Sequence, residues 1–109
     1  TALAEQVHSG TNEHAKELLI RALNDGSSEV RAEAATIAGK TLEPEEIINE
    51  LCGLLKDEDN QVRINTALAL MKTEEISSIN SLSEAMTAEE DGQVKSVLKV
   101  ALNQLIALK

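Results

Sequence analysis

Hydrophobic positions along this chain recur with the period of an amphipathic helix. The clearest stretch runs from Pro44 to Lys56, where the aliphatic residues fall on one stripe: Ile47, Ile48, Leu51, Leu54 and Leu55. Pro44 suits the first helical position, because its missing N–H has no helical partner there. Glu45 and Glu46 follow at the positive end of the helix dipole. After a short turn, Asn60 is the predicted N-cap of a second helix.

The same pattern returns at a fixed interval of 32 residues, in segments that begin at Leu18, Glu50 and Leu82 and align without gaps. Four columns carry the match: Val30, Val62 and Val94; Arg31, Arg63 and Lys95; Asp25, Asp57 and Glu89; Ala38, Leu70 and Leu102. A helical pair of this length cannot bury its apolar stripe alone, so the units must stack. The sequence therefore predicts an all-α protein of about three stacked helical pairs.

The repeat divides a single domain, 1–109, into a partial repeat or cap over 1–12 and repeats over 13–42, 43–74 and 75–109. Thr73, Glu74 and Glu75 are predicted to start the third unit's first helix. Ser28 and Gly92 share the column of Asn60, the predicted helix start. Residues 1–4 repeat the pattern of residues 66–69, which leaves two interpretations open. The segment is either the end of a preceding unit in a longer array or an N-terminal cap.

These columns resemble the HEAT-repeat family over roughly Glu13 to Leu105. The matching stretches are Leu54-Leu55-Lys56-Asp57 through Val62-Arg63 to Ala67-Leu68-Ala69-Leu70, and Ala22-Leu23-Asn24-Asp25 through Val30-Arg31 to Ala34-Ala35. The resemblance implies an α-solenoid. It also implies a ladder between neighbouring units from an Asp and the Arg six residues later. Those residues are Asp25 with Arg31 and Asp57 with Arg63, while the third unit departs from the pattern with Glu89 and Lys95 around a Gly92 turn.

Charge and composition narrow the classes of partner. The 109 residues include no Phe, Tyr or Trp, and 19 acidic residues against 10 basic ones give a formal charge of −9. Such a chain repels phosphate and lacks stacking platforms, so we expect a protein partner and neither nucleic acid nor membrane. No apolar run approaches the roughly 20 residues that span a bilayer. The single cysteine, Cys52, fits a reducing compartment, and we expect cytoplasmic localisation.

Few residues offer catalytic or metal chemistry. His8 and His14 lie six apart, whereas helical ligands of one metal are usually three or four apart, so both are interpreted as surface residues. Cys52 has no sequence partner and is interpreted as a packed thiol. The paired glutamates at 45–46, 74–75 and 89–90 lie at helix starts or turns and are interpreted as capping charges. We therefore expect no enzyme activity, no metal and no cofactor.

The resemblance leaves one enzymatic alternative. Chromophore lyases of light-harvesting antennae and certain alkylpurine glycosylases are similar to HEAT arrays. A glycosylase of that kind needs a basic cleft with aromatic residues, which this sequence lacks. A lyase subunit must hold a tetrapyrrole, and no aromatic or Cys-rich lining for one is visible, so this remains the lesser alternative.

The resemblance also implies that second helices line the concave side, where HEAT arrays commonly bind partners. Val30, Ala34, Ile37 and Ala38 are expected in the core of unit one. The predicted partner-binding residues are Glu33, Thr36, Lys40, Asn65, Leu68, Lys72, Val97, Val100 and Gln104. The second helices contain six basic and two acidic residues, a charge compatible with an acidic peptide or domain, although ladder pairing neutralises part of it.

Val97 and Val100 have another interpretation, packing under the C-terminal tail or under a further unit, which we favour over binding. The function expected is a non-catalytic protein–protein interaction module. A structural spacer or cap of a longer solenoid and an accessory subunit of a chromophore lyase are the alternatives.

Overall fold

The structure, a computed structural model, describes residues 12–109; His8 and most of the predicted partial repeat lie outside this range. Helices follow one another in chain order with one short 3₁₀ turn. They are α2 (Asn12–Leu23), α3 (Ser28–Thr41), α4 (Pro44–Leu54), α5 (Asn60–Thr73), η1 (Ile76–Ser78), α6 (Ile79–Ala88) and α7 (Gly92–Ala107). The predicted all-α solenoid of helical hairpins is confirmed.

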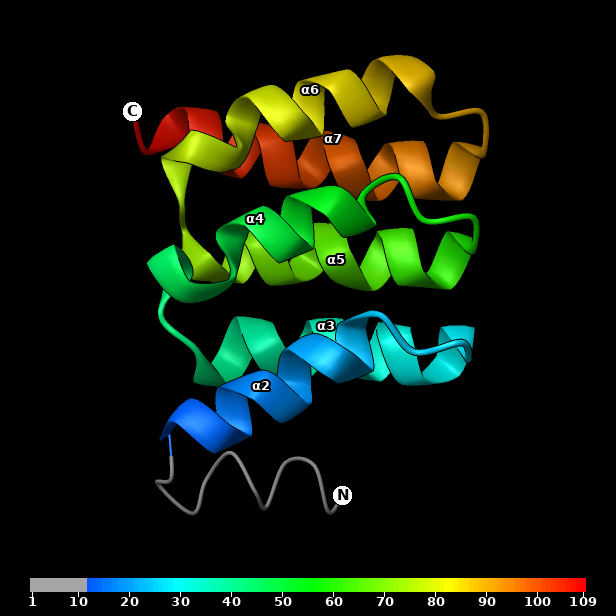
Figure 1. Ribbon diagram of the computed structural model, residues 1–109. Helices are drawn as coiled ribbons and strands as arrows, with labels where there is room; N and C mark the ends of the chain where they lie inside the picture. The colour runs from blue at the N-terminus through cyan, green and yellow to red at the C-terminus, as the bar shows by residue number, and fades with distance from the viewer. Residues whose placement is uncertain (1–11) are drawn as a thin grey trace.

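The helices form two layers (Figure 1). The outer layer contains α2, α4 and α6, and the inner layer contains α3, α5 and α7. Contacts between the hairpins are concentrated in the inner layer, where α3 packs along α5 and α5 along α7, while α2 and α4 barely touch. Successive hairpins are therefore joined mainly through the inner helices.

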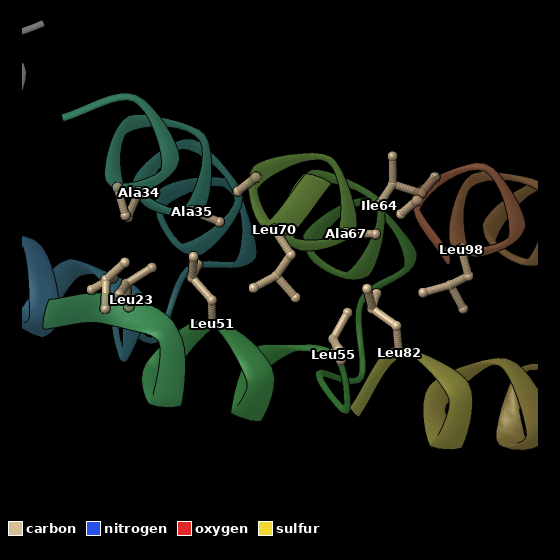
Figure 2. Close-up of a cluster of buried hydrophobic side chains, with 14 of the residues drawn as sticks. Leu23, Ala34, Ala35, Leu51, Leu55, Ile64, Ala67, Leu70, Leu82 and Leu98 are labelled. Carbon is tan, nitrogen blue, oxygen red and sulfur yellow. The ribbon is translucent and has the colours of Figure 1, made fainter. Parts of the chain in front are cut away.

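Aliphatic side chains between the layers form the core. Figure 2 shows Leu51, Leu55 and Leu82 of the outer elements pointing towards Leu70 and Leu98 of the inner helices. Other fully or nearly buried members of this cluster are Leu19, Leu23, Ala34, Ala35, Ala38, Ile47, Ala67, Val94, Ala101 and Leu105. With no aromatic residue available, Leu, Ile and Val fill the space between layers and alanine brings the helices together.

The inner helices α3 and α5 approach each other closely at Gly39 of α3. A Cβ atom added to this glycine would lie 2.7 Å from the Cβ and 2.9 Å from the Cα of Ala69 in α5. Real carbon atoms in contact are about 3.5–4.0 Å apart. Gly39 therefore allows the backbones of α3 and α5 to meet at a distance that no other residue permits.

The helix starts differ from the prediction by one residue. Asp59, and not Asn60, caps α5, because its carboxylate accepts the backbone N–H groups of Gln61 and Val62. In the same column Ser27 caps α3 and Asp91 caps α7. An acceptor preceding the first helical residue can reach the free N–H groups of the first turn.

Two further boundaries depart from the prediction. Helix α4 begins at Pro44 as predicted but ends at Leu54 rather than Lys56. Thr73 ends α5 instead of starting the next helix, and Glu74 takes a left-handed conformation with φ of 55°. Glu75 then caps η1 by accepting the N–H of Ser77. Thr73-Glu74-Glu75 has the composition of a helix start, which is why the sequence predicted one. The left-handed conformation of Glu74 instead ends α5, and the next helical turn begins only after Glu75.

Candidate partner-binding surface

The nine predicted partner-binding residues all lie on the inner layer, but they differ in exposure. Lys40, Lys72, Glu33 and Gln104 are exposed to solvent. Leu68 is 43% exposed and Val100 is 50% exposed. These six residues, which we call the inner-face set, are available to a partner.

The other three predicted residues are half-buried, and Asn65 joins two units. The Asn65 Nδ2 donates to the Ala32 carbonyl oxygen of the preceding unit, over 3.1 Å. The hydroxyl of Thr36 donates to the same carbonyl within its own helix α3, over 3.4 Å. Val97 is half-buried and packs against the core. Polar character and outward register cannot distinguish a stacking residue from a binding one before the neighbouring helix is in place.

Three of the inner-face set meet around a hollow at the C-terminal ends of α5 and α7. Its volume is about 500 Å³. The lining combines aliphatic side chains with one basic, one acidic and one amide group: Leu68, Met71, Leu105, Leu108, Lys72, Glu74 and Gln104. An apolar floor with polar groups at its edge is typical of a surface that binds a protein segment.

Two arginines cross from one unit to the next at the other end of the hairpins. The Arg31 Nε lies 2.8 Å from Asp57 Oδ2, and the Arg63 Nε lies 2.8 Å from Glu89 Oε1. A second guanidinium nitrogen of each arginine donates to the same carboxylate, at 3.2 Å for Asp57 and 3.0 Å for Glu89. Both ion pairs are bidentate and largely buried.

The Asp and the Arg six residues later are also bonded to each other, but the acceptor is the backbone carbonyl oxygen of the Asp and not its carboxylate. Arg31 donates to the carbonyl oxygen of Asp25, and Arg63 to that of Asp57, each over 2.7 Å. The carboxylates of Asp57 and Glu89 pair instead with the arginine of the preceding unit. Glu89 takes the same place as Asp57 despite its longer side chain, while Lys95 has no ion pair within residues 12–109.

The ion pairs of the ladder lower the pKa values of its two acidic residues. Burial alone would raise the pKa of the Asp57 carboxyl, but the hydrogen bonds from Arg31 and from the N–H of Asp59 lower that pKa below its ordinary value. The pKa of Glu89 is lowered in the same way: desolvation opposes the shift, and the bonds from Arg63 and the N–H of Asp91 outweigh it. The hydrogen bond to Asp57 raises the pKa of Arg31. Both acids are therefore held in the charged form.

A second hollow lies on the outer side, between α4 and α6, with a volume of about 670 Å³. Cys52, Ala85 and Glu84 line it together with the ladder groups Asp57, Arg63 and Glu89. Sequence reasoning missed this hollow, since it arises where the outer helices separate. Three of its six charged side chains, Asp57, Arg63 and Glu89, belong to the ladder.

Groups considered for catalysis or metal binding are not brought together. His14 is exposed on α2, and Cys52 is half-buried on α4. Within residues 12–109, His, Cys, Asp and Glu form no cluster of three that could hold a metal ion. In the same part of the chain, no helix is both long and apolar enough to cross a membrane.

The stacked hairpins, the inter-unit arginines and the sequence columns define a HEAT-type array, and a family model of HEAT repeats matches residues 15–103. The chain belongs to the HEAT-repeat family. It is similar to the bilin biosynthesis protein MpeU of Synechococcus sp. (strain WH8020), with 50% identity over 105 residues. The match covers 96% of this chain but only 35% of MpeU, so the chain spans about a third of that relative's length.

Proposed function

We propose that this chain is a non-catalytic, protein-recognition segment of a bilin-processing HEAT protein, and that the inner-face set binds the partner. The observation that carries the proposal is the pair of exposed aliphatic residues, Leu68 and Val100, beside lysines on the inner layer. Water-exposed aliphatic groups framed by polar side chains are covered at low cost by a partner of matching shape.

Charge favours an acidic partner segment. The chain carries a formal charge of −9, yet the three inner helices contain six basic and two acidic residues. Arg31 and Arg63 are paired with Asp57 and Glu89, which leaves four lysines against Glu29 and Glu33. The inner helices thus carry a small excess of positive charge on an acidic molecule, which favours a partner segment that combines acidic and aliphatic residues.

The similarity to MpeU supplies the biological setting. A relative at 50% identity over almost the whole chain supports a role in handling bilins, and the array supports protein recognition within that role. The partner that fits both is the protein that receives or delivers the bilin. We therefore favour a recognition segment of a chromophore lyase over a structural spacer.

The test compares two variants with the same change in charge. Leu68→Glu with Lys72→Glu disrupts the inner face, whereas Asn80→Glu with Lys56→Glu places equal charge on exposed outer positions. Both must first match the native chain in helicity and melting. In a binding assay with a purified bilin-carrying antenna protein, we expect the outer variant to bind like the native chain and the inner variant to lose at least about tenfold in affinity. Equal binding by the two variants would refute the inner face as the recognition surface.

Direct handling of the chromophore is the second candidate, favoured by the similarity to a bilin biosynthesis protein. Titration of the native chain with a free linear tetrapyrrole, followed by visible absorbance, separates it from protein recognition. A saturable spectral shift would mean that this segment itself holds the bilin. An unchanged spectrum, together with binding to the antenna protein, supports recognition alone.

A further inference from the structure

The two edges of the stack differ in their chemistry. Within the stack, the face of α5 turned to α3 includes Asn65, which bonds to Ala32, and Ala69, which meets Gly39. By helical spacing the same stripe includes Val62. The equivalent positions of α3 are Val30, Glu33 and Ile37, which therefore form the N-terminal edge, so Glu33 of the inner-face set also borders this edge.

Val30 does not have the environment predicted for it. Val62 and Val94, in the same column, are completely buried, whereas Val30 is 37% exposed. Ile37 is half-buried, while Ala69 in its column is 4% exposed. The N-terminal edge thus keeps the aliphatic residues of an internal stacking face but lacks equivalent cover.

The ladder shows the same incompleteness at this edge. Asp57 and Glu89 each accept a backbone N–H two residues ahead and also pair with an arginine of the preceding unit. Asp25, in the same column, accepts the N–H of Ser27 over 2.8 Å. Within residues 12–109, its carboxylate has no ion pair. One acceptor side of Asp25 is therefore placed where an arginine would reach it.

The C-terminal edge is built differently. Ile64 and Ala67 of α5 lie on the side of that helix towards α7 (Figure 2) and are buried. Ser96 and Lys99 occupy their columns in α7 and are exposed. This edge therefore presents Ser96 and Lys99 where a stacked helix has Ile64 and Ala67, and it offers less apolar surface to a further unit than the N-terminal edge does.

We propose that the N-terminal edge of α2 and α3 is the docking surface for a further helical pair of the same repeat type, supplied by the same polypeptide. The inner helix of that pair carries an arginine that binds Asp25, and its small and aliphatic residues cover Val30 and Ile37. The α7 edge, where Ser96 and Lys99 are exposed, is less suited to receive such a unit. Continuity with the two existing interfaces defines the shape of the occupant, and the charge of Asp25 defines its arginine. A relative about three times as long as the match supports a source within the same polypeptide.

Two extended chains test this asymmetry. In the first, a copy of residues 43–74, which carries Arg63, Ile64 and Ala67, precedes Thr1 of the complete chain. In the second, the same copy follows Lys109 through a flexible linker as long as residues 1–11. Cys52→Ser is introduced throughout, and a single reporter thiol is placed at Val30→Cys or, as the matched control on the α7 edge, at Ser96→Cys.

Thiol labelling is the first measurement. We expect the Val30→Cys thiol to react at least about tenfold more slowly in the first extended chain than in the native-length chain, because stacking covers it. The Ser96→Cys thiol should react equally fast with and without the C-terminal copy. Unchanged reactivity at position 30, or protection at position 96, would overturn the assignment of the edges.

The ladder is tested separately, in case Val30→Cys disturbs folding. Asp25→Asn should lower the melting temperature of the first extended chain by about 2–4 °C and leave that of the native-length chain almost unchanged. Replacing the ladder arginine in the added copy by glutamine should give the same loss, and combining the two changes should add little. An equal effect of Asp25→Asn in both lengths would show that Asp25 receives no arginine from the added unit.

Discussion

Gly39→Ala tests the packing of the inner layer most directly. The added Cβ would lie 2.7 Å from the Cβ of Ala69, 2.9 Å from its Cα and 3.2 Å from its carbonyl oxygen. Two of these three atoms belong to the backbone, so a change of rotamer cannot relieve the contact. Restoring ordinary separations of about 3.5–4.0 Å requires α3 and α5 to move apart by about 1 Å.

Two effects of this substitution oppose each other. Within a helix, alanine is favoured over glycine by about 1 kcal/mol. Overpacking of a close interface costs about 1–3 kcal/mol, and the upper part of that range applies because the contact is with backbone. Separation of α3 from α5 also weakens the bond from Asn65 to the Ala32 carbonyl. We expect a net loss of about 1–2 kcal/mol in the free energy of unfolding.

Urea unfolding followed by far-ultraviolet circular dichroism measures this loss, since the chain has no tryptophan. Gly53→Ala is the matched control: Gly53 lies in α4, and a Cβ there meets nothing within 4 Å. It should gain up to about 1 kcal/mol from helix propensity alone. Gly39→Ala should also cost less when Ala69→Gly removes the nearest atom. A Gly39→Ala chain as stable as the Gly53→Ala chain would show that close packing of α3 on α5 does not limit this position.

Three further predictions concern the ladder and the helix ends. Asp57→Asn should lower the melting temperature at neutral pH and flatten its fall in acid. The reason is that the lowered pKa of Asp57 adds stability above its ordinary value of 3.8, and this stability is lost as the pH falls through the folded-state pKa. Asp25→Asn, measured in the same pH series, should resemble the native chain, and equal profiles for the two variants would contradict the ladder's role. Asp59→Ala should lower the free energy of unfolding in urea by about 1 kcal/mol and Asn60→Ala by clearly less, since only the former removes the α5 cap. A larger loss for Asn60→Ala would identify Asn60 as the cap. Glu74→Gly should raise the melting temperature, because glycine adopts a φ of 55° without the steric cost of a side chain, and a lower value would indicate that Glu74 makes a stabilising contact.

The class of fold follows from local information that a sequence contains. A repeat of 32 residues with aliphatic columns at helical spacing predicts helical pairs, and their one-sided apolar stripes require stacking. Pro44 as the first residue of α4 was predictable, since proline is tolerated at that position for a purely local reason. Helix caps were missed by one residue because Asp59 and Asn60 are both good caps, and only the path of the backbone selects Asp59.

Contacts between units could not be derived from one sequence. The columns identified the ladder residues, but the choice of Asp57 as the acceptor for Arg31 depends on how one hairpin is placed on the next. Asn65 and Leu68 both point outward in the helical pattern. The approach of α3 turns Asn65 into a stacking residue and leaves Leu68 exposed.

The sequence by itself determined the length of the repeat, the helices and the residue types of the core, because these depend on residues within a few helical turns of one another. Tertiary structure alone decided the closeness of Gly39 to Ala69, the exposure of Val30 and the groups that line each hollow. These features depend on distances between helices, and small side chains allow several such distances for the same pattern of hydrophobic and polar positions.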